Sequence, residues 1–314
     1  MPGPALHFLL ARDFFDDRAG SEPCVPFPTA DPVVRNAFLN GAIAPDAGYC
    51  PGGTRFQADL SHYLGTGRLV RCLLEAASTD IERAFAWGWV SHILADVAIH
   101  PLINRAVGRL FNRDGRNMEY ADDPTAHAWV EFPLDAAVCM RHGARLEAGL
   151  HPCFDATTVN FLAGAFRDTY GVPFDTAEAL ATHRAAVRFC HRIHAIHRLL
   201  AVPQRIGHRR LADHLFYFPA FWLVAFPLLK AVLIFKYRRL PLPARKWLCT
   251  PPELLAEIEE KRPIIRQQMR RLAQEGLAEL EDFNLDTGRV EAEPSYSLTK
   301  ATLTKLEGLA GNGG

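Results

Sequence analysis

The sequence has no excess of charge of either sign, because 35 lysine and arginine residues balance 35 aspartate and glutamate residues. Proteins that bind nucleic acids usually carry a basic surface, so this balance does not indicate a nucleic-acid partner. The chain also lacks the G-x-S-x-G motif of serine esterases. Its glycine pair, Gly52 and Gly53, is not followed by the Lys-Ser/Thr of a phosphate-binding loop, and we expect this pair to form a tight turn.

The cysteines do not form the pattern of a disulfide framework. They number seven, they are widely spaced, and no two of them form a C-x-x-C pair. Scattered free thiols are typical of a reducing compartment. The first residues lack the basic start and the long apolar run of a signal peptide, so we expect a cytoplasmic protein.

Strand-like alternation of polar and apolar residues is missing, whereas helical periodicity recurs along the chain. The run from Ile81 to Leu110 is apolar on nearly all sides, which is typical of a central, buried helix. Residues 46–56 are rich in glycine and are expected to form a loop, and the C-terminal tail is expected to be disordered. The sequence therefore predicts an all-α fold. Further helices are expected at residues 32–45, 66–78, 125–148, 155–168, 176–200 and 251–281, the last as one helix or a pair.

Three ionisable residues share one face of the central helix. His92, Asp96 and His100 follow one another at intervals of four residues, which places neighbouring side chains about 5–6 Å apart on the same side. The rest of this helix is rich in apolar residues, so the three groups are expected to be buried. Burying a charge without a partner is costly. We therefore expect these groups to pair with one another or to bind a metal ion.

The helix expected at 125–148 repeats the arrangement with His127, Glu131 and Asp135. Imidazole and carboxylate groups suit zinc, and two helices that face each other with such stripes can enclose a metal ion. One His-x-x-x-Asp pair alone is more often an ordinary hydrogen-bonded pair, but two stripes in adjacent helices favour a metal centre. Two roles are open for Asp135: it supports the site from one turn beyond Glu131, or it faces solvent.

Taken in order, these residues resemble the zinc-dependent phospholipase C family, which is related to the single-strand-specific zinc nucleases. The resemblance covers roughly residues 4–135. The family's motifs are an early histidine, an aspartate in a Pro-Asp loop, a later histidine, a His-x-x-x-Asp helix, a further histidine and a His-x-x-x-Glu helix. The matching residues here are His7, Asp46, His62, His92, Asp96, His100, His127 and Glu131.

The resemblance implies a multi-helix bundle of this family's type with a C-terminal helical extension. It implies a zinc-dependent hydrolase that cleaves phosphodiester bonds in phospholipids, in which Asp46 orients or deprotonates the attacking water. The implied ligands of one zinc are Asp46, His62, His92 and Asp96. Those of a second are His100, His127 and Glu131. A third zinc, between His7 and Asp96, remains open.

The chain is expected to divide into the family's helical domain at 1–200, an apolar segment at 201–240 and a C-terminal helical region at 241–314. Residues 215–235 are apolar apart from Lys230 and approach the length of a membrane span, but Pro219 and Pro227 interrupt them. Three interpretations are open: a buried helix, contact with a membrane surface through 215–238, and a span. A phospholipid substrate, together with the aromatic and basic residues, favours surface contact.

Other histidines are weaker candidates for a site. His191, His194 and His197 are spaced by three residues, which drifts around a helix, so we expect a solvated or hydrogen-bonded face. His183 lies near other basic residues and could join a patch that attracts phosphate.

Two other functions remain open. A zinc nuclease or phosphatase could use the same cluster, although the zero net charge and the apolar segment favour a lipid. A membrane-associated protein could also retain zinc without turnover. Only a catalytic centre keeps a coordination position open for water, and the sequence does not reveal such a position. It is equally silent on the head group and on the oligomeric state.

Overall fold

A computed structural model of the chain describes residues 3–15, 25–112, 115–120, 122–142, 150–155, 159–206, 250–290, 298 and 300–311. Within 159–206, side chains are described up to residue 192. The apolar segment 215–235 lies outside these residues, so its three interpretations stay open. The division of the chain into three parts also stays a prediction.

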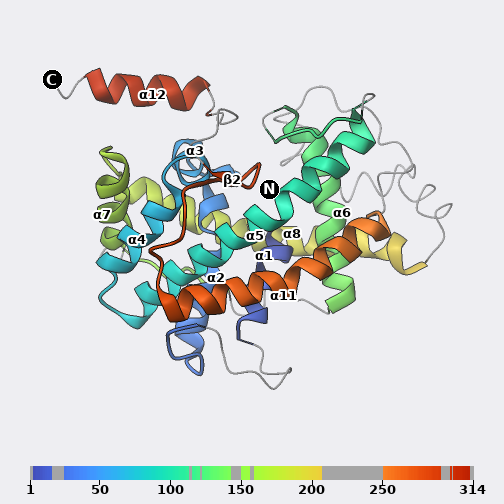
Figure 1. The fold of residues 1–314 in the computed structure, drawn as a ribbon, viewed down its shortest axis with the longest axis horizontal. Helices are drawn as coiled ribbons and strands as arrows, with labels where there is room; N and C mark the ends of the chain where they lie inside the picture. Colours follow the sequence, from blue (N-terminus) through green and yellow to red (C-terminus); the bar gives the residue numbers. More distant parts are fainter. Residues whose placement is uncertain are drawn as a thin grey trace.

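Most of the described residues are helical, which confirms the all-α prediction (Figure 1). The only strands among them are β1 (Phe283–Asn284) and β2 (Arg289–Val290), which pair antiparallel with Phe283 opposite Val290. The helices are α1 (Pro4–Asp13), α2 (Pro32–Ile43), the 3-10 helix η2 (Pro45–Tyr49), α3 (Arg55–Tyr63), α4 (Thr66–Ala76), α5 (Asp80–Phe111), α6 (Pro124–His142), α7 (Val159–Tyr170), α8 (Thr176–Ile206), α11 (Pro252–Glu275) and α12 (Lys300–Gly311).

Some local expectations were wrong. The stretch 46–56, expected as a loop, contains most of η2 and the start of α3. Helices α1 and α3 were not predicted from the sequence. The tail was expected to be disordered; α12 continues to Gly311, and the last three residues, 312–314, lie outside the described residues. Residues 251–281 hold one helix, α11, that ends at Glu275. Short helices of this kind take their stability from packing, which the local pattern does not show.

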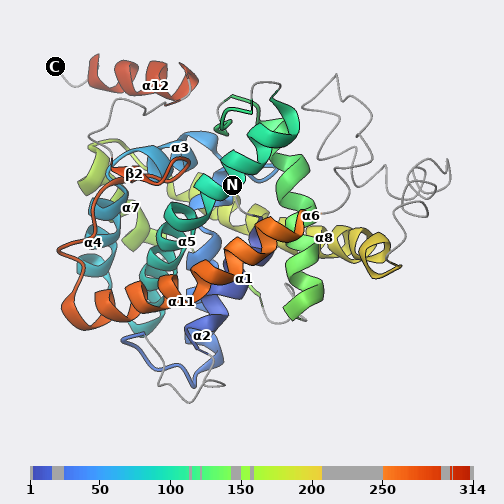
Figure 2. The ribbon, with the colours of Figure 1, turned by 45° about the vertical axis from the view of Figure 1, so that its right-hand side comes forward.

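Helix α5 is the centre of the fold, as its apolar pattern predicts (Figures 1 and 2). It begins with a capping box in which the Thr79 hydroxyl accepts the Glu82 backbone N–H and the Glu82 carboxylate accepts the Thr79 N–H. The helix continues through Pro101, and its buried residues run from Glu82 to Gly108. The polar stripe of α5, His92, Asp96 and His100, is therefore buried inside the protein.

Helix α11 packs across the core in both ribbon views (Figure 2). Its buried residues Leu254, Ile258, Ile265 and Met269 belong to the same hydrophobic cluster as the apolar residues of α5. The sequence left open whether the C-terminal region packs on the core, covers the site or binds a partner. For α11 the structure shows packing on the core.

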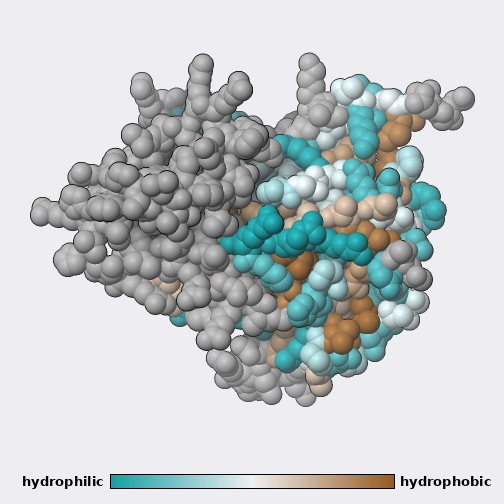
Figure 3. All heavy atoms as spheres, turned by 180° about the vertical axis from the view of Figure 1, so that it is seen from behind, coloured by the Kyte–Doolittle hydropathy of each residue, from teal (hydrophilic) through white to brown (hydrophobic). Residues whose placement is uncertain are grey.

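The described surface is mixed in character. On the face turned away in Figure 1, hydrophilic and hydrophobic residues interleave over the coloured part (Figure 3). The large hydrophobic side chains that are exposed there and elsewhere, Val33, Ile264 and Leu303, lie on three different helices. Among the described residues, no helix combines the length and the hydrophobicity needed to cross a bilayer.

Candidate metal centre

Five elements bring the candidate ligands into the interior of the protein. α1 carries one histidine, η2 the aspartate of the Pro-Asp sequence, α3 a second histidine, and α5 and α6 the two polar stripes. All eight side chains are buried: His7, Asp46, His62, His92, Asp96, His100, His127 and Glu131.

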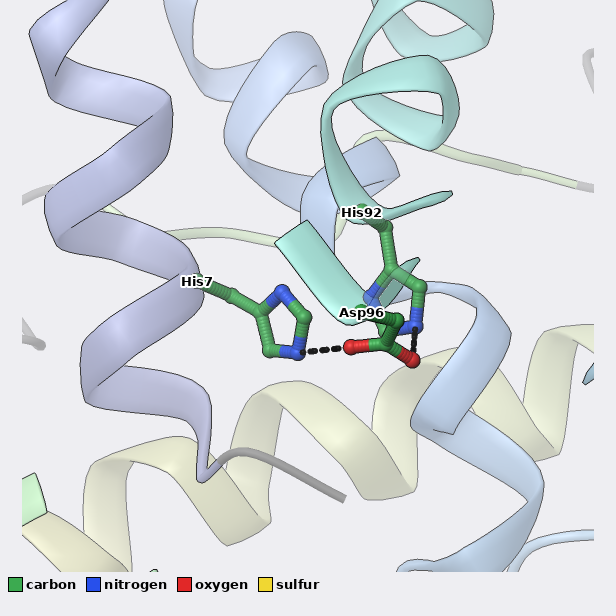
Figure 4. Close-up of side chains that lie close together, drawn as sticks. All are labelled: His7, His92 and Asp96. Carbon is green, nitrogen blue, oxygen red and sulfur yellow. Dashed lines mark ion pairs between the residues drawn. The ribbon is translucent and has the colours of Figure 1, made fainter. Parts of the chain in front are cut away.

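Asp96 lies between two imidazoles (Figure 4). Its Oδ1 is 3.3 Å from Nε2 of His7, and its Oδ2 is 3.1 Å from Nε2 of His92. The two histidine rings stack with centroids 4.1 Å apart and planes 9° from parallel. Residues from α1 and α5 therefore converge on one carboxylate, and their ligand atoms lie within 4.8 Å of one another.

A second group of ligand atoms adjoins the first and shares His92. Asp46 Oδ1 is 3.0 Å from Nε2 of His62 and 3.6 Å from Nε2 of His92. The ligand atoms of these three residues also lie within 4.8 Å of one another. The structure thus brings the first five candidates, His7, Asp46, His62, His92 and Asp96, into one compact array.

Backbone carbonyls determine which nitrogen of each ring carries the proton. His62 donates from Nδ1 to the carbonyl of Ala58 at 2.8 Å, and His92 donates from Nδ1 to the carbonyl of Ala42 at 2.9 Å. In the neutral imidazoles Nε2 is then a lone pair, assigned here from the hydrogen-bond network. Each lone pair faces a carboxylate oxygen, which is also an acceptor.

Two acceptors in van der Waals contact repel each other unless a proton or a metal cation lies between them. Within the described part of the chain, His92 Nε2 and both carboxylate oxygens of Asp96 make no hydrogen bond, although all are buried. Both ring nitrogens of His7 are likewise without one. Nitrogen and carboxylate donors in this arrangement fit zinc.

The electrostatics of the array favour ionised carboxylates. Burial raises the pKa of Asp96, but the positive charge of His92 and His100 in their protonated form outweighs it and holds the pKa well below its usual range. At Asp46 burial again raises the pKa, and His92 and His62 outweigh it, so the net shift is downward. A positive charge beside these carboxylates, on imidazolium or on a metal ion, therefore favours their ionised form, which is the form that binds metal.

The other three candidates form a looser group. His127 donates from Nε2 to the carbonyl of Met118 at 2.8 Å, which leaves Nδ1 facing Glu131 Oε1 at 3.3 Å. His100 Nε2 is 3.9 Å from Asp96 Oδ1. Among the described residues, none of the compact ligand groups includes His100, His127 or Glu131. The pair on α6 nevertheless repeats the arrangement of a lone pair facing a carboxylate.

Comparison with protein families gives one result. The family described as zinc dependent phospholipase C matches residues 7–184, which is more than half of the chain. The chain belongs to the zinc-dependent phospholipase C family. No curated protein and no solved structure matches it.

The family match confirms the resemblance seen in the sequence. It includes all eight candidate ligands and ends within α8. Helices α11 and α12 and the hairpin of β1 and β2 lie beyond it. The family is zinc-dependent, and the buried histidine and aspartate groups are compatible with metal, but the number of ions is not given by the structure.

Asp135 holds the first turn of α1, the helix that carries His7. Its two carboxylate oxygens accept the backbone N–H groups of Ala5 and Leu6 at 3.0 and 3.1 Å. These are first-turn amides, which lack the carbonyl partner four residues earlier that later turns have, although Leu6 also donates to Gly3 at 3.1 Å. Burial raises the pKa of Asp135 to about 8. Of the two roles left open by the sequence, solvent exposure was wrong, because the side chain is fully buried.

One carboxylate at the site was missed by sequence reasoning. Asp286, in the turn between β1 and β2, has Oδ1 3.4 Å from Nδ1 of His100 and is buried. Burial raises its pKa, but His100 outweighs this and the net shift is downward. No spacing in the sequence links residues 100 and 286, so only the tertiary fold reveals this contact.

The glycine pair forms the expected turn. Gly52 has φ +88°, a conformation that favours glycine. A Cβ on Gly53 would lie 2.2 Å from the carbonyl oxygen of Ala47, so the turn packs directly on η2. This close approach supports the helix that carries Asp46.

The weaker histidine candidates with described side chains, His191 and His183, do not join the site. His191 contacts the carbonyl of Leu150 through Nε2 at 3.0 Å, as expected for a hydrogen-bonded face. The side chains of His194 and His197 lie outside those described. His183 is buried, and burial lowers its pKa to about 4, so it is neutral and does not attract phosphate.

Proposed function

We propose that this protein is a zinc-dependent hydrolase that cleaves phosphodiester bonds in phospholipids. The observation that supports the proposal most directly is the buried array around Asp46 and Asp96, in which the Nε2 lone pairs of His62 and His92 face carboxylate oxygens. Family membership supports the type of reaction. A purely structural pairing of the same residues would need a second proton on each of His62 and His92, because backbone carbonyls already accept their Nδ1 protons.

We assign the ligands in three sets. The first holds Asp46, His62, His92 and Asp96. The second holds His100, His127 and Glu131. The third joins His7 to Asp96, whose two oxygens face different imidazoles. Bound zinc would lower the pKa of a coordinated water toward ~7 and polarise phosphoryl oxygens.

Asp46 is the residue that we assign to the reacting water. It lies on η2, and it is among the most exposed of the eight candidates, as is Glu131, although both count as buried. Its lowered pKa keeps the carboxylate ionised, so it can accept or orient a proton of the water. His62, His92 and His127 keep a lone pair directed inward, because the opposite nitrogen of each ring donates to a backbone carbonyl.

The first test is the metal content of the full chain, purified without a metal-affinity tag. We expect at least two zinc ions per chain, and a sharp fall in a variant with His92→Ala and Glu131→Ala. Because these residues are buried and the variant could unfold, zinc is also removed from the wild type with a chelator and then restored. Wild-type protein that binds no zinc after zinc is supplied would exclude the proposal.

The second test is a comparison of substrates. Zinc-loaded protein is offered phospholipid vesicles, single-stranded polynucleotide and a phosphomonoester, and we expect release of a phosphorylated head group from the vesicles. Cleavage of the polynucleotide alone would favour the nuclease alternative. Full zinc with no hydrolysis of any substrate would favour a non-catalytic zinc protein.

The Asp46→Asn variant tests the assignment of that residue. We expect kcat to fall by roughly 10²–10⁴-fold while much of the zinc is retained. Full activity with full zinc would exclude Asp46 from the reaction.

Contact with a membrane through residues 215–238 is part of the proposal that rests on sequence alone. Its support is the aromatic and basic composition of the segment. Deleting residues 215–238 should weaken binding to anionic liposomes. Equal binding by the deletion variant and the wild type would remove this part of the proposal and leave the zinc chemistry intact.

A further inference from the structure

The hairpin of β1 and β2 is fastened to two helices that carry candidate zinc ligands. The backbone N–H of Leu285 donates to the carbonyl of His62 on α3 at 2.9 Å. The side chain of Asn104 on α5 donates to the carbonyl of Asp286 at 2.7 Å. The hairpin is therefore held against the site on both sides, although it lies well beyond the end of the family match.

The turn of the hairpin also approaches α5 beside His100. Gly288 has φ +70°, and a Cβ there would lie 2.6 Å from the carbonyl oxygen of Val97. Asn284 accepts the backbone N–H groups of Asp286 and Thr287 at 3.0 and 3.2 Å, which defines the turn. This contact leaves the Asp286 side chain little freedom to move.

The Asp286 carboxylate is directed at the interior and is held there. Both of its oxygens accept the backbone N–H of Tyr120, at 3.1 and 3.0 Å. Oδ1 is also 3.4 Å from Nδ1 of His100. On the other side of the same ring, Nε2 of His100 is 3.9 Å from Asp96. The imidazole thus lies between Asp286 and the candidate ligands.

We propose that Asp286 positions His100, by accepting the proton on Nδ1 and so directing the Nε2 lone pair toward the metal centre. Carboxylates commonly play this part beside histidine ligands, because they determine the tautomer and the orientation of the ring. The described ligands His62, His92 and His127 use backbone carbonyls for the same purpose. Among the described residues, no backbone carbonyl accepts from His100, and Oδ1 of Asp286, 3.4 Å from Nδ1, occupies the corresponding place.

The inference rests on the proposed function, because it requires zinc beside His100. It also gives the C-terminal hairpin a role at the site. A protein cut off after the family match would lose the carboxylate that orients one ligand.

The test compares Asp286→Asn with Asp282→Asn in the full chain. Asp282 lies in the same region, but its carboxylate accepts the backbone N–H of Arg68 instead. Zinc affinity is measured by competition with a chromophoric chelator. We expect Asp286→Asn to weaken one bound zinc by about 10–100-fold and Asp282→Asn to leave all zinc affinities unchanged.

A spectroscopic readout separates orientation from mere stability. In zinc-loaded protein labelled with ¹⁵N at histidine, we expect the His100 resonance, assigned by its loss in His100→Gln, to show a proton on Nδ1 and metal at Nε2. The Asp286→Asn substitution should shift that Nδ1 resonance. If this variant does not fold, the wild-type spectrum alone decides the tautomer, and a proton on Nε2 of His100 overturns the inference.

The remaining outcomes are distinct. Wild-type protein that binds no zinc overturns both this inference and the proposed function. Zinc-binding wild type with an unaltered Asp286→Asn variant overturns only the role of Asp286. Complete loss of one zinc on Asp286→Asn would show that the carboxylate binds the metal directly, which also overturns a positioning role.

Discussion

Gly41 of α2 and Gly88 of α5 allow the backbones of their helices to touch. A Cβ on Gly41 would lie 2.0 Å from the carbonyl oxygen of Phe85, and a Cβ on Gly88 would lie 2.1 Å from that of Phe38. One turn further along α5, His92 reaches the carbonyl of the α2 residue Ala42 at 2.9 Å. The closeness of the two helices therefore determines the orientation of a candidate zinc ligand.

Replacing Gly88 with alanine should separate these helices. The new methyl group would meet backbone rather than a flexible side chain, so we expect a loss of about 3 kcal/mol or more in the free energy of unfolding. The carbonyl of Ala42 would also move away from His92, which should weaken zinc binding. Urea denaturation and zinc content measure the two effects.

The control for this substitution is Gly164→Ala in α7. The nearest atom to a Cβ there is the end of the flexible Arg167 side chain, at 4.0 Å. Since alanine is the better helix former, this variant should be unchanged or more stable by up to about 1 kcal/mol. Equal destabilisation of both variants would contradict the close helix contact.

Asp135 should link stability to the position of His7. Asp135→Ala leaves the amides of Ala5 and Leu6 without their carboxylate, so we expect about 1–3 kcal/mol of destabilisation. His7 directly follows Leu6 in α1, so a displaced first turn would also move His7, and zinc affinity should fall as well. The comparison is Asp31→Ala, which removes the exposed cap of α2. The free energy of unfolding of Asp31→Ala should fall by about 1 kcal/mol, and its zinc affinity should not change. Equal zinc affinity in Asp135→Ala and Asp31→Ala would argue against the link.

His183 should make the protein sensitive to acid. Burial lowers its pKa from 6.5 to about 4, and Nε2 accepts the backbone N–H of Cys153. The unfolded chain therefore binds a proton more readily, so stability is complete above about pH 6.5 and falls as the pH drops toward 4. From this shift the loss should approach about 3 kcal/mol.

His183→Gln keeps an acceptor for the Cys153 amide but does not titrate. Free energies of unfolding are measured from pH 4 to 7 for both proteins with matched zinc content. We expect the curve of the variant to be flatter by the contribution of one histidine. Parallel curves would show that the pKa of His183 is the same in the folded and unfolded states.

The ion pair of Arg262 and Asp13 should couple α11 to α1. Two nitrogens of Arg262 reach the two oxygens of Asp13, each at 2.8 Å, and both side chains are about one-fifth exposed. A double-mutant cycle with alanine at each position should give a coupling energy of about 1 kcal/mol. The exposed pair Arg83 and Asp80 should give less, about 0.3–0.5 kcal/mol, because solvent screens it. A coupling energy of zero between Arg262 and Asp13 would mean that only the apolar residues of α11 hold it against the core.

The sequence by itself determined the features that depend on local spacing. The all-α class follows from helical periodicity, and the central place of α5 follows from its apolar character. The stripes of His92 and Asp96 and of His127 and Glu131 also follow, because residues four apart share one face of a helix. Their order along the chain was sufficient to identify the family, which the match to residues 7–184 confirms.

The tertiary structure alone decided how these local features meet. The short helices η2 and α3 form because packing and close glycine contacts stabilise them, which local propensity does not show. Asp135 reaches α1 across 130 positions of the chain, and Asp286 reaches His100 from the far C-terminal hairpin. Contacts between residues so distant in sequence depend on how whole helices pack, and no periodicity within a single segment encodes them.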